Sequence, residues 1–288
     1  MTLERFCELC GFNADEEKII AGYLAEEKIN AAGLEICRLC FEAPERPETF
    51  PEPVEGDDLA KANLVSAFYG IEYAKQIHAS LGIPQYILEN GMRDIAIWSR
   101  HELRDKGVFG IRRGFHWTNV LYRAVALRFG RLECNLTRGF RLDELRDEAG
   151  NLLLKKDDPL IGLHIPADGA LDIDACIDSM RKMAEFFDWY KPDYHYKGFV
   201  VDTWLVDPLL AQFLPPESNI VRFQQLGIQY LIQDEYDPTF WMWGTRDPEK
   251  VANPSELQRK ALAFIKSGGV FKYYGMYIPK ERIVKAAQ

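Results

Sequence analysis

Three side chains able to exchange protons lie in or beside segments that we predict as strands. His164 ends an apolar run, Asp202 lies within FVVDTWLVD, and Glu133 lies where apolar residues alternate. Histidine titrates nearest neutral pH and so suits a general base, and a carboxylate buried in a strand needs a partner or a role. We therefore consider His164 and Asp202 as candidate general bases, with Glu133 ranked below them. The alternatives are a structural hydrogen-bonded histidine, a paired carboxylate, and a Glu133 side chain that faces solvent.

The segment from Leu160 to Pro215 must position two of these groups. It reads as a strand to Pro166, a loop containing Gly169, an amphipathic helix, a second strand over Gly198–Val206, and a further helix. The helix is predicted because apolar residues recur every three or four positions. Backbone N–H groups in a loop between a strand and a helix bind anions readily. The apolar positions of that helix are Ile173, Ile177, Met180, Ala184 and Phe187.

Two Cys-x-x-Cys pairs, Cys7 with Cys10 and Cys37 with Cys40, have the spacing of zinc ligands. However, the 26 residues between the pairs are acid-rich and helical in pattern, and buried thiols on helix faces would give the same spacing. We expect no metal, and keep a structural zinc site as the alternative.

Composition narrows the class of protein. The 288 residues are 47% hydrophobic and carry a net charge of -9, and Lys and Arg form no cluster longer than a pair. Such a charge argues against nucleic acid or an anionic membrane as a partner. Neither a signal-peptide pattern nor an 18-residue apolar run is present, so we expect a cytoplasmic protein with reduced cysteines.

The first hundred residues have the pattern of helices. Apolar periodicity predicts helices over residues 1–41, 59–78 and 85–107. The intervening Glu42–Asp58 holds four prolines and seven acids, so we predict a solvated loop there. We predict an all-helical domain over residues 1–110.

Residues 111–288 have a mixed pattern. Phe115–Leu121, Tyr122–Phe129 and Arg131–Thr137 read as antiparallel strands, and Gly150-Asn151 as a hairpin turn. The expected fold class is thus α+β, an all-helical domain followed by a mixed-sheet domain. The remaining predicted elements are a helix over Asn219–Leu226, a strand over Ile228–Gln233, a helix from Asn253 as its cap to Gly268, and a strand over Val270–Ile278.

This order of elements resembles that of GNAT-type acyltransferases. More specifically, the chain resembles the bacterial acyltransferase-domain family that joins a helical N-acyltransferase-type N-terminal domain to a GNAT-like C-terminal domain. The matching segments cover nearly the whole chain. They are LGIPQYILENGMRDIAIWSRH, then Trp117, Asn119 and Leu121 with ALRFGRLECNL, then GLHIPADGALDIDA, WLVDPLLAQFLPPESNIVRFQ and SELQRKALAFIKSGG.

The resemblance implies transfer of an acyl group from an acyl-CoA, such as acetyl-CoA, to a small-molecule acceptor by direct attack of its amine. The loop after the strand that contains His164 would hold the cofactor, with help from a later helix. The residues implied in cofactor binding are Ile165, Ala167, Gly169, Ala170, Leu171, Asn219 and Arg222.

Two features depart from the GNAT pattern. The loop has one glycine instead of the Q/R-x-x-G-x-G/A motif, and Asp168, Asp172 and Asp174 would repel a pyrophosphate. Phe223 occupies the position of a proton-donating tyrosine, which leaves a water or another tyrosine, such as Tyr274 or Tyr277, for that role. The alternative is a catalytically degenerate relative that binds a small molecule or a protein. The sequence leaves open whether the chain forms a homodimer.

Overall fold

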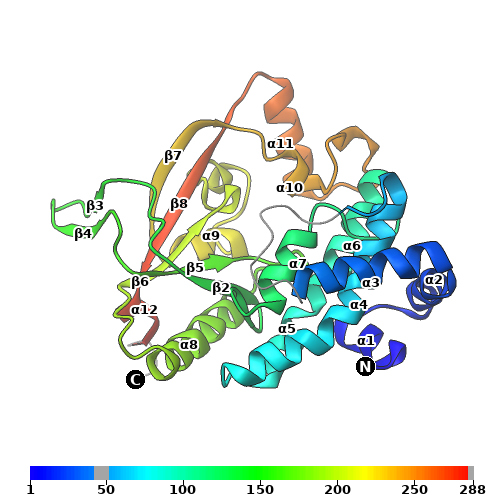
Figure 1. Ribbon diagram of the computed structural model, residues 1–288. Coiled ribbons are helices and arrows are strands. Elements are labelled where there is room, and N and C mark those ends of the chain that lie inside the picture. Colours follow the sequence, from blue (N-terminus) through cyan, green and yellow to red (C-terminus); the bar gives the residue numbers. More distant parts are fainter. Residues whose placement is uncertain (42–51, 285–288) are drawn as a thin grey trace. The chain divides into compact units, whose positions relative to one another are not determined.

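The computed structural model describes residues 1–41 and 52–284 (Figure 1). The chain forms two compact units, Met1–Arg128 with Pro166–Asp168, and Phe129–Ile165 with Gly169–Gln288. Most of the predicted loop over Glu42–Asp58 lies outside the described residues, and the predicted boundary after residue 110 stays a prediction. Each unit is described by itself below.

The first unit is helical, as predicted. Asn13 caps one helix in a reciprocal capping box with Glu16, and Gly11 ends the preceding helix with φ of 75°. Apolar residues from these helices pack into one core that includes Phe6, Ile36 and Leu64. The helices are α1 (Leu3–Cys10), α2 (Ala14–Ala25), α3 (Glu27–Phe41), α4 (Gly56–Ser80), α5 (Gln85–Gly91), α6 (Arg93–Lys106) and α7 (Phe115–Tyr122).

Helices α3 and α4 make the closest helix contact in this unit. A Cβ added at Gly33 would lie 2.4 Å from Cγ1 of Val65, so only glycine lets the two backbones approach so closely. The contact fixes α3 against the longest helix of the chain.

The predicted strand over Phe115–Leu121 is wrong, because this segment forms α7. Thr118 and Asn119 donate hydrogen bonds to the carbonyls four residues earlier, and the Tyr122 hydroxyl donates to the Ala67 carbonyl of α4 at 2.8 Å. Tertiary burial against α4 outweighs the strand propensity of the aromatic and β-branched residues. The predicted strand over Tyr122–Phe129 shrinks to its last three residues.

The second unit contains most of a six-stranded sheet with the strand order β1-β2-β5-β6-β8-β7, and a separate hairpin of β3 and β4. Pairing is antiparallel between β2 and β5, β6 and β8, and β7 and β8, but parallel between β5 and β6. The strands are β1 (Leu127–Phe129), β2 (Leu132–Thr137), β3 (Glu144–Arg146), β4 (Leu152–Lys155), β5 (Leu160–His164), β6 (Gly198–Asp202), β7 (Ile228–Tyr236) and β8 (Phe271–Pro279).

Helices connect these strands. The last long helix begins after Ser255, whose side chain caps it together with Gln258, and not after Asn253 as predicted. The predicted strand over Gly198–Val206 ends at Asp202, and its last residues form a 3₁₀ turn at Trp204–Val206. In place of the predicted helix before Pro215 there is a second 3₁₀ turn, at Pro208–Gln212. The elements are α8 (Ile173–Tyr190), 3₁₀ turns at Trp204–Val206, Pro208–Gln212 and Pro248–Lys250, α9 (Asn219–Gln224), α10 (Thr239–Trp243), α11 (Glu256–Lys266) and α12 (Lys280–Val284).

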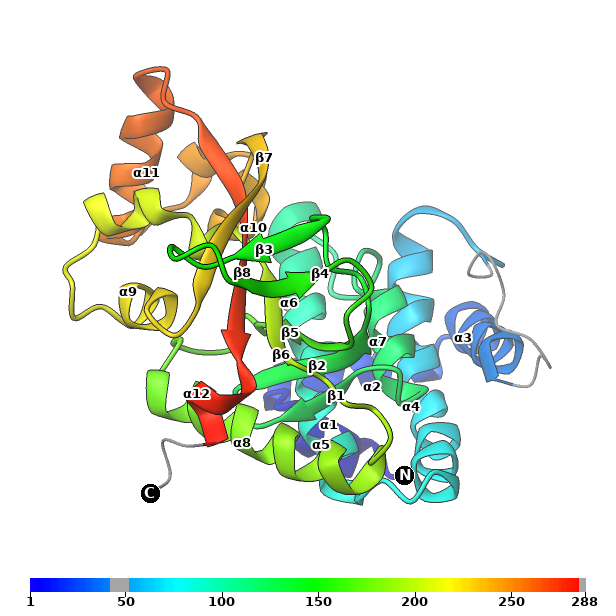
Figure 2. The same cartoon turned by 90° about the vertical axis from the view of Figure 1, so that its left-hand side faces the viewer.

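The β3–β4 hairpin lies over one face of the sheet (Figure 2). Its turn contains Gly150, as the sequence predicted. Leu145 and Leu154 from the hairpin pack with Val200, Tyr230 and Tyr277 from the sheet. This apolar cluster fixes the hairpin on the face that also carries the proton-exchanging side chains.

The fold class predicted from the sequence, a helical region followed by a mixed sheet, is confirmed. Within residues 1–41 and 52–284, none of the helices combines the length and apolar character needed to traverse a lipid bilayer.

Candidate functional site

The two parallel strands separate toward their carboxyl ends. Among the described residues, the parallel register joins Ile161 to Phe199 and Gly162 to Val200 and extends no further. Beyond these pairs, in the described part of the chain, β5 remains paired only with β2, and β6 remains paired only with β8. In open sheets with parallel strands, ligands bind outside the carboxyl ends of the strands where neighbouring strands diverge.

The candidate bases occupy one face of this sheet. Glu133 is directly opposite His164 in the antiparallel register. His164 and Asp202 are each two residues beyond the paired Gly162 and Val200, and side chains two residues apart share a face. Glu133 is only 1% exposed, so the alternative that it faces solvent is wrong.

His164 has a specific polar partner that the sequence did not reveal. Its Nε2 lies 2.7 Å from Oδ1 of Asn135, which can only accept a hydrogen bond. Nε2 therefore carries the proton of the neutral imidazole, and the lone pair is on Nδ1. A Cβ at Gly162 would lie 3.1 Å from the same Oδ1, so the glycine clears space for this contact.

Burial lowers the pKa of His164 from 6.5 to about 4. The imidazole is consequently neutral at pH 7 and able to accept a proton.

Asp202 is bound on several sides. Its Oδ2 accepts from Nε of Arg141 at 2.7 Å, and its Oδ1 accepts from the Tyr230 hydroxyl at 3.1 Å. The Tyr273 hydroxyl donates to its backbone carbonyl at 2.9 Å. Burial and the negative charge of Asp202 raise the pKa of Tyr273 to about 12 and that of Tyr230 further, so both phenols stay protonated donors. Asp202, whose side chain is 23% exposed, thus has partners on both carboxylate oxygens.

A glycine also makes room for this cluster. A Cβ at Gly275 would lie 2.3 Å from the Tyr230 ring, in the strand register directly opposite Asp202. The tyrosine ring therefore covers β8 at the one position that has no side chain.

Two backbone N–H groups in the loop between β5 and α8 have a defined direction. Arg131 donates from Nε to the Ala170 carbonyl at 2.7 Å and from Nη2 to the Gly169 carbonyl at 3.0 Å. In a trans peptide the C=O and the following N–H point in opposite directions. Arg131 thereby turns the N–H groups of Ala170 and Leu171 away from itself, and within the described chain neither has an acceptor.

The other loop residues predicted for cofactor binding lie close along the chain. Ile165 follows β5 directly, and Ala167 is exposed. Asp172 caps α8 by accepting from the Ala175 N–H at 2.9 Å, so part of its charge is used within the helix.

Helix α9 supplies the two remaining predicted cofactor residues. Asn219 is its first residue, after the capping Ser218, and Arg222 is in its last turn. The helix contacts α8. Phe223 on the same helix is fully buried and has no proton to donate. The substitute tyrosine Tyr277 donates to the Lys197 carbonyl, and burial raises its pKa to about 12.

The zinc alternative has no counterpart in the part of the chain that is described. No group of three or more His, Cys, Asp or Glu side chains there could hold a metal ion. Cys7, Cys10, Cys37 and Cys40 are all buried, and burial raises the pKa of Cys7 and Cys40 to about 11. Cys7, Cys10 and Cys40 pack in the helical core, and Cys37 is buried on the same helix as Cys40.

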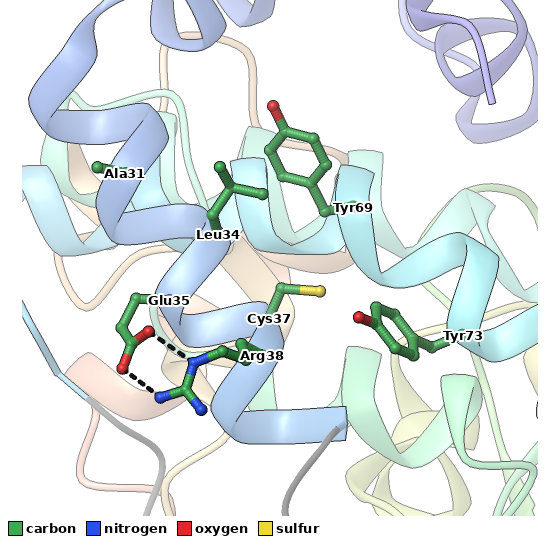
Figure 3. A pocket seen from close by; sticks show the side chains of 7 residues that line it. All are labelled: Ala31, Leu34, Glu35, Cys37, Arg38, Tyr69 and Tyr73. Atoms are coloured by element: carbon green, nitrogen blue, oxygen red, sulfur yellow. Dashed lines mark hydrogen bonds and ion pairs between the residues drawn. The ribbon is translucent and has the colours of Figure 1, made fainter.

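A pocket in the first unit contains none of the predicted catalytic residues. It has a volume of about 500 Å³ and lies between α3 and α4, with Tyr69 and Tyr73 facing α3 (Figure 3). Its one acid and one base, Glu35 and Arg38, bind each other through two hydrogen bonds. The lining residues are Ala31, Leu34, Glu35, Cys37, Arg38, Tyr69 and Tyr73.

Some partners could have been inferred and others could not. Asn135 is two residues from Glu133, so strand alternation alone places both on one face. Tyr230 likewise lies in a predicted strand. Arg141 follows a predicted strand and Arg131 begins one, and nothing in the sequence links them to Asp202 or to the loop.

Comparisons with known proteins identify the family of the chain. The family model described as a GNAT-like C-terminal domain matches residues 126–277. A search of curated proteins finds no match.

Solved structures share the fold. The chain is similar to an acyltransferase in complex with decanoyl-CoA and teicoplanin, with a TM-score of 0.71 and 18% identity over 96% of this chain and 87% of that chain. A structure of an acyltransferase with decanoyl-CoA gives 0.64 and 21% identity over 87% and 76%. Another, with CoA and 10C-Teicoplanin, gives 0.67 and 16% identity over 97% and 99%.

The chain thus shares the fold of these solved structures. Since the family model covers more than half of the 288 residues, the chain belongs to the family of proteins with a GNAT-like C-terminal domain.

Proposed function

We propose that this protein is an acyl-CoA-dependent N-acyltransferase that acts on a small-molecule amine by direct attack. The observation that carries the proposal is the divergence of β5 and β6 beyond Gly162 and Val200, next to a loop whose N–H groups are held outward by Arg131. A cofactor pyrophosphate needs such outward donors, and a thioester needs the space between the diverging strands.

The donor would bind along the loop and α9. The N–H groups of Ala170 and Leu171 would donate to the pyrophosphate oxygens, with Gly169 and Ala167 allowing close approach of the backbone. Asn219 and Arg222 would add side-chain donors from α9. The solved acyltransferases of this fold hold decanoyl-CoA or CoA, which supports acyl-CoA as the donor class.

The reaction would start when the neutral amine of the acceptor attacks the thioester carbonyl carbon. A C–N bond forms, the C–S bond breaks, and CoA leaves as a thiolate that is then protonated. The backbone N–H of Ile165, the first after β5, would donate to the carbonyl oxygen as negative charge develops on it.

His164 would remove the amine proton through Nδ1. Its hydrogen bond to Asn135 fixes the tautomer and the ring orientation that this role needs. A pKa of about 4 makes the imidazole a weak base, so transfer suits the stage at which the nitrogen is already bonded to carbon and its proton is more acidic. Asp202 and Glu133 would then hold the surroundings in place and not act as the base.

A second candidate function is favoured by one observation. Phe223 is buried where the resemblance expects a proton-donating tyrosine. A relative without that acid could bind an acyl-CoA or another small molecule without turnover.

Calorimetric titration of the full chain with CoA and decanoyl-CoA tests donor binding. We expect micromolar affinity, and loss of binding in Gly169→Asp, which adds a charge to the loop. Release of the CoA thiol in the presence of a panel of primary amines then tests transfer. Binding without thiol release from any amine would favour the binding module, and no binding at millimolar ligand would reject both uses of the loop.

A further inference from the structure

A buried arginine of the first unit, Arg128, binds two carboxylates of the same unit, one of which lies in the segment between β5 and α8. Arg128 of β1 is 3% exposed, and its Nη1 lies 3.3 Å from Oδ1 of Asp94 in α6, itself 4% exposed. Its Nη2 lies 2.5 Å from Oδ2 of Asp168 in the loop. A buried guanidinium with two carboxylate partners is a strongly directional contact, because removal of one partner leaves charge uncompensated.

The loop has few other means of holding its shape. Residues 167–170 are exposed, so apolar burial does not fix their backbone. Two arginines three residues apart, on either side of the turn at Gly130, provide polar contacts to the loop. Arg128 binds the Asp168 carboxylate, and Arg131 binds the carbonyls of the next two residues.

We propose that Asp168, held by Arg128 and Asp94, is a positioning residue for the acyl-CoA loop. The inference rests on the proposed function, in which this loop holds the pyrophosphate. The sequence suggested the opposite sign, namely that Asp168 repels the cofactor. In the structure the carboxylate of Asp168 faces Arg128. This contact would hold the N–H groups of Ala170 and Leu171 in their binding orientation before the ligand arrives, which lowers the entropy cost of binding.

Asp174 provides a matched control. It is also a carboxylate at the start of α8, but it is exposed and, in the described structure, makes no hydrogen bond or ion pair. Simple repulsion predicts that Asp168→Asn and Asp174→Asn both tighten CoA binding. Positioning predicts that they act in opposite directions.

The experiment is calorimetric titration of CoA into the full-length protein and the two variants. We expect Asp168→Asn to weaken binding by about tenfold, because the weaker amide contact leaves the loop mobile, and Asp174→Asn to leave affinity unchanged or improve it up to about threefold. Arg128→Lys should resemble Asp168→Asn, since lysine cannot contact both carboxylates at once. In steady-state assays the KM for acyl-CoA should rise, while kcat should change by less than about twofold because His164 is untouched.

Amide hydrogen exchange of the ligand-free protein separates this inference from the proposed function. We expect faster exchange at Ala170 and Leu171 in Asp168→Asn but not in Asp174→Asn, with thermal unfolding confirming that both variants fold. Unchanged exchange, or CoA binding by Asp168→Asn at least as tight as wild type, would overturn the positioning role. Failure of the wild type to bind CoA would instead remove the proposed function.

Discussion

The ends of β5 and β6 offer two equivalent positions with opposite chemical outcomes. His164 and Asp202 are at the same level of neighbouring parallel strands, yet His164 has the neutral Asn135 as its hydrogen-bond acceptor whereas Asp202 receives bonds from Arg141 and Tyr230. The Nε2–H bond leaves Nδ1 of His164 with its lone pair, whereas both carboxylate oxygens of Asp202 already accept hydrogen bonds from protein donors. We therefore expect the hydrogen-bond partner, more than the position in the strand, to decide which of the two side chains can act as a base.

Replacement of the two residues should separate their roles most strongly. We expect His164→Gln to lower kcat by about 10²- to 10⁴-fold, the usual contribution of a general base, with CoA affinity retained. Asp202→Asn should reduce kcat far less but destabilise the fold by about 1–3 kcal/mol, because it weakens the contacts of a buried phenol and a guanidinium. Thiol-release kinetics and urea unfolding measure the two effects, and equal losses of kcat would remove the distinction.

The acid stability of the protein provides a second comparison. The folded pKa of His164 is about 4 and the unfolded value about 6.5, so between these pH values the unfolded chain binds more protons and stability falls as pH is lowered. The full loss attributable to His164 below pH 4 is on the order of 3 kcal/mol. Unfolding of the wild type and of His164→Gln should therefore diverge between about pH 6.5 and 4. If the free energies of unfolding of the two proteins changed in parallel with pH, this burial effect would be contradicted. The other histidines are present in both proteins, so their contributions do not affect the difference.

Two glycines allow the smallest test. Gly162→Ala places a methyl 3.1 Å from the Asn135 oxygen that binds His164, and we expect a loss in kcat of about tenfold with less than about 1.5 kcal/mol of destabilisation. Gly275→Ala collides with the Tyr230 ring at 2.3 Å and should cost more stability than activity. Both kcat and the free energy of unfolding are measured for the two variants. If the loss in kcat relative to the loss in stability were the same for both, the proposed difference between His164 and Asp202 would be contradicted.

The sequence predicted the helical unit and the central strands well, whereas the catalytic roles of His164, Asp202 and Glu133 stay predictions. Periodicity succeeds for α8 and β5 because burial on one face imposes it. It fails for α7, whose strand-like residues become helical through contacts with α4 that are distant in sequence. The same limit applies to Arg131 and Arg141, since long side chains that reach across loops leave no pattern in the residues around them.

The strand order has a consequence for how the protein is made. The last strand, β8, lies between β6 and β7 and pairs with both. During synthesis, β6 and β7 leave the ribosome without the partner that joins them, and their paired arrangement has to wait for residues near Pro279. Until then the backbone edge of β6 that later pairs with β8 is open to pairing with other strands. Nascent chains stalled before β8 should therefore depend most on chaperones.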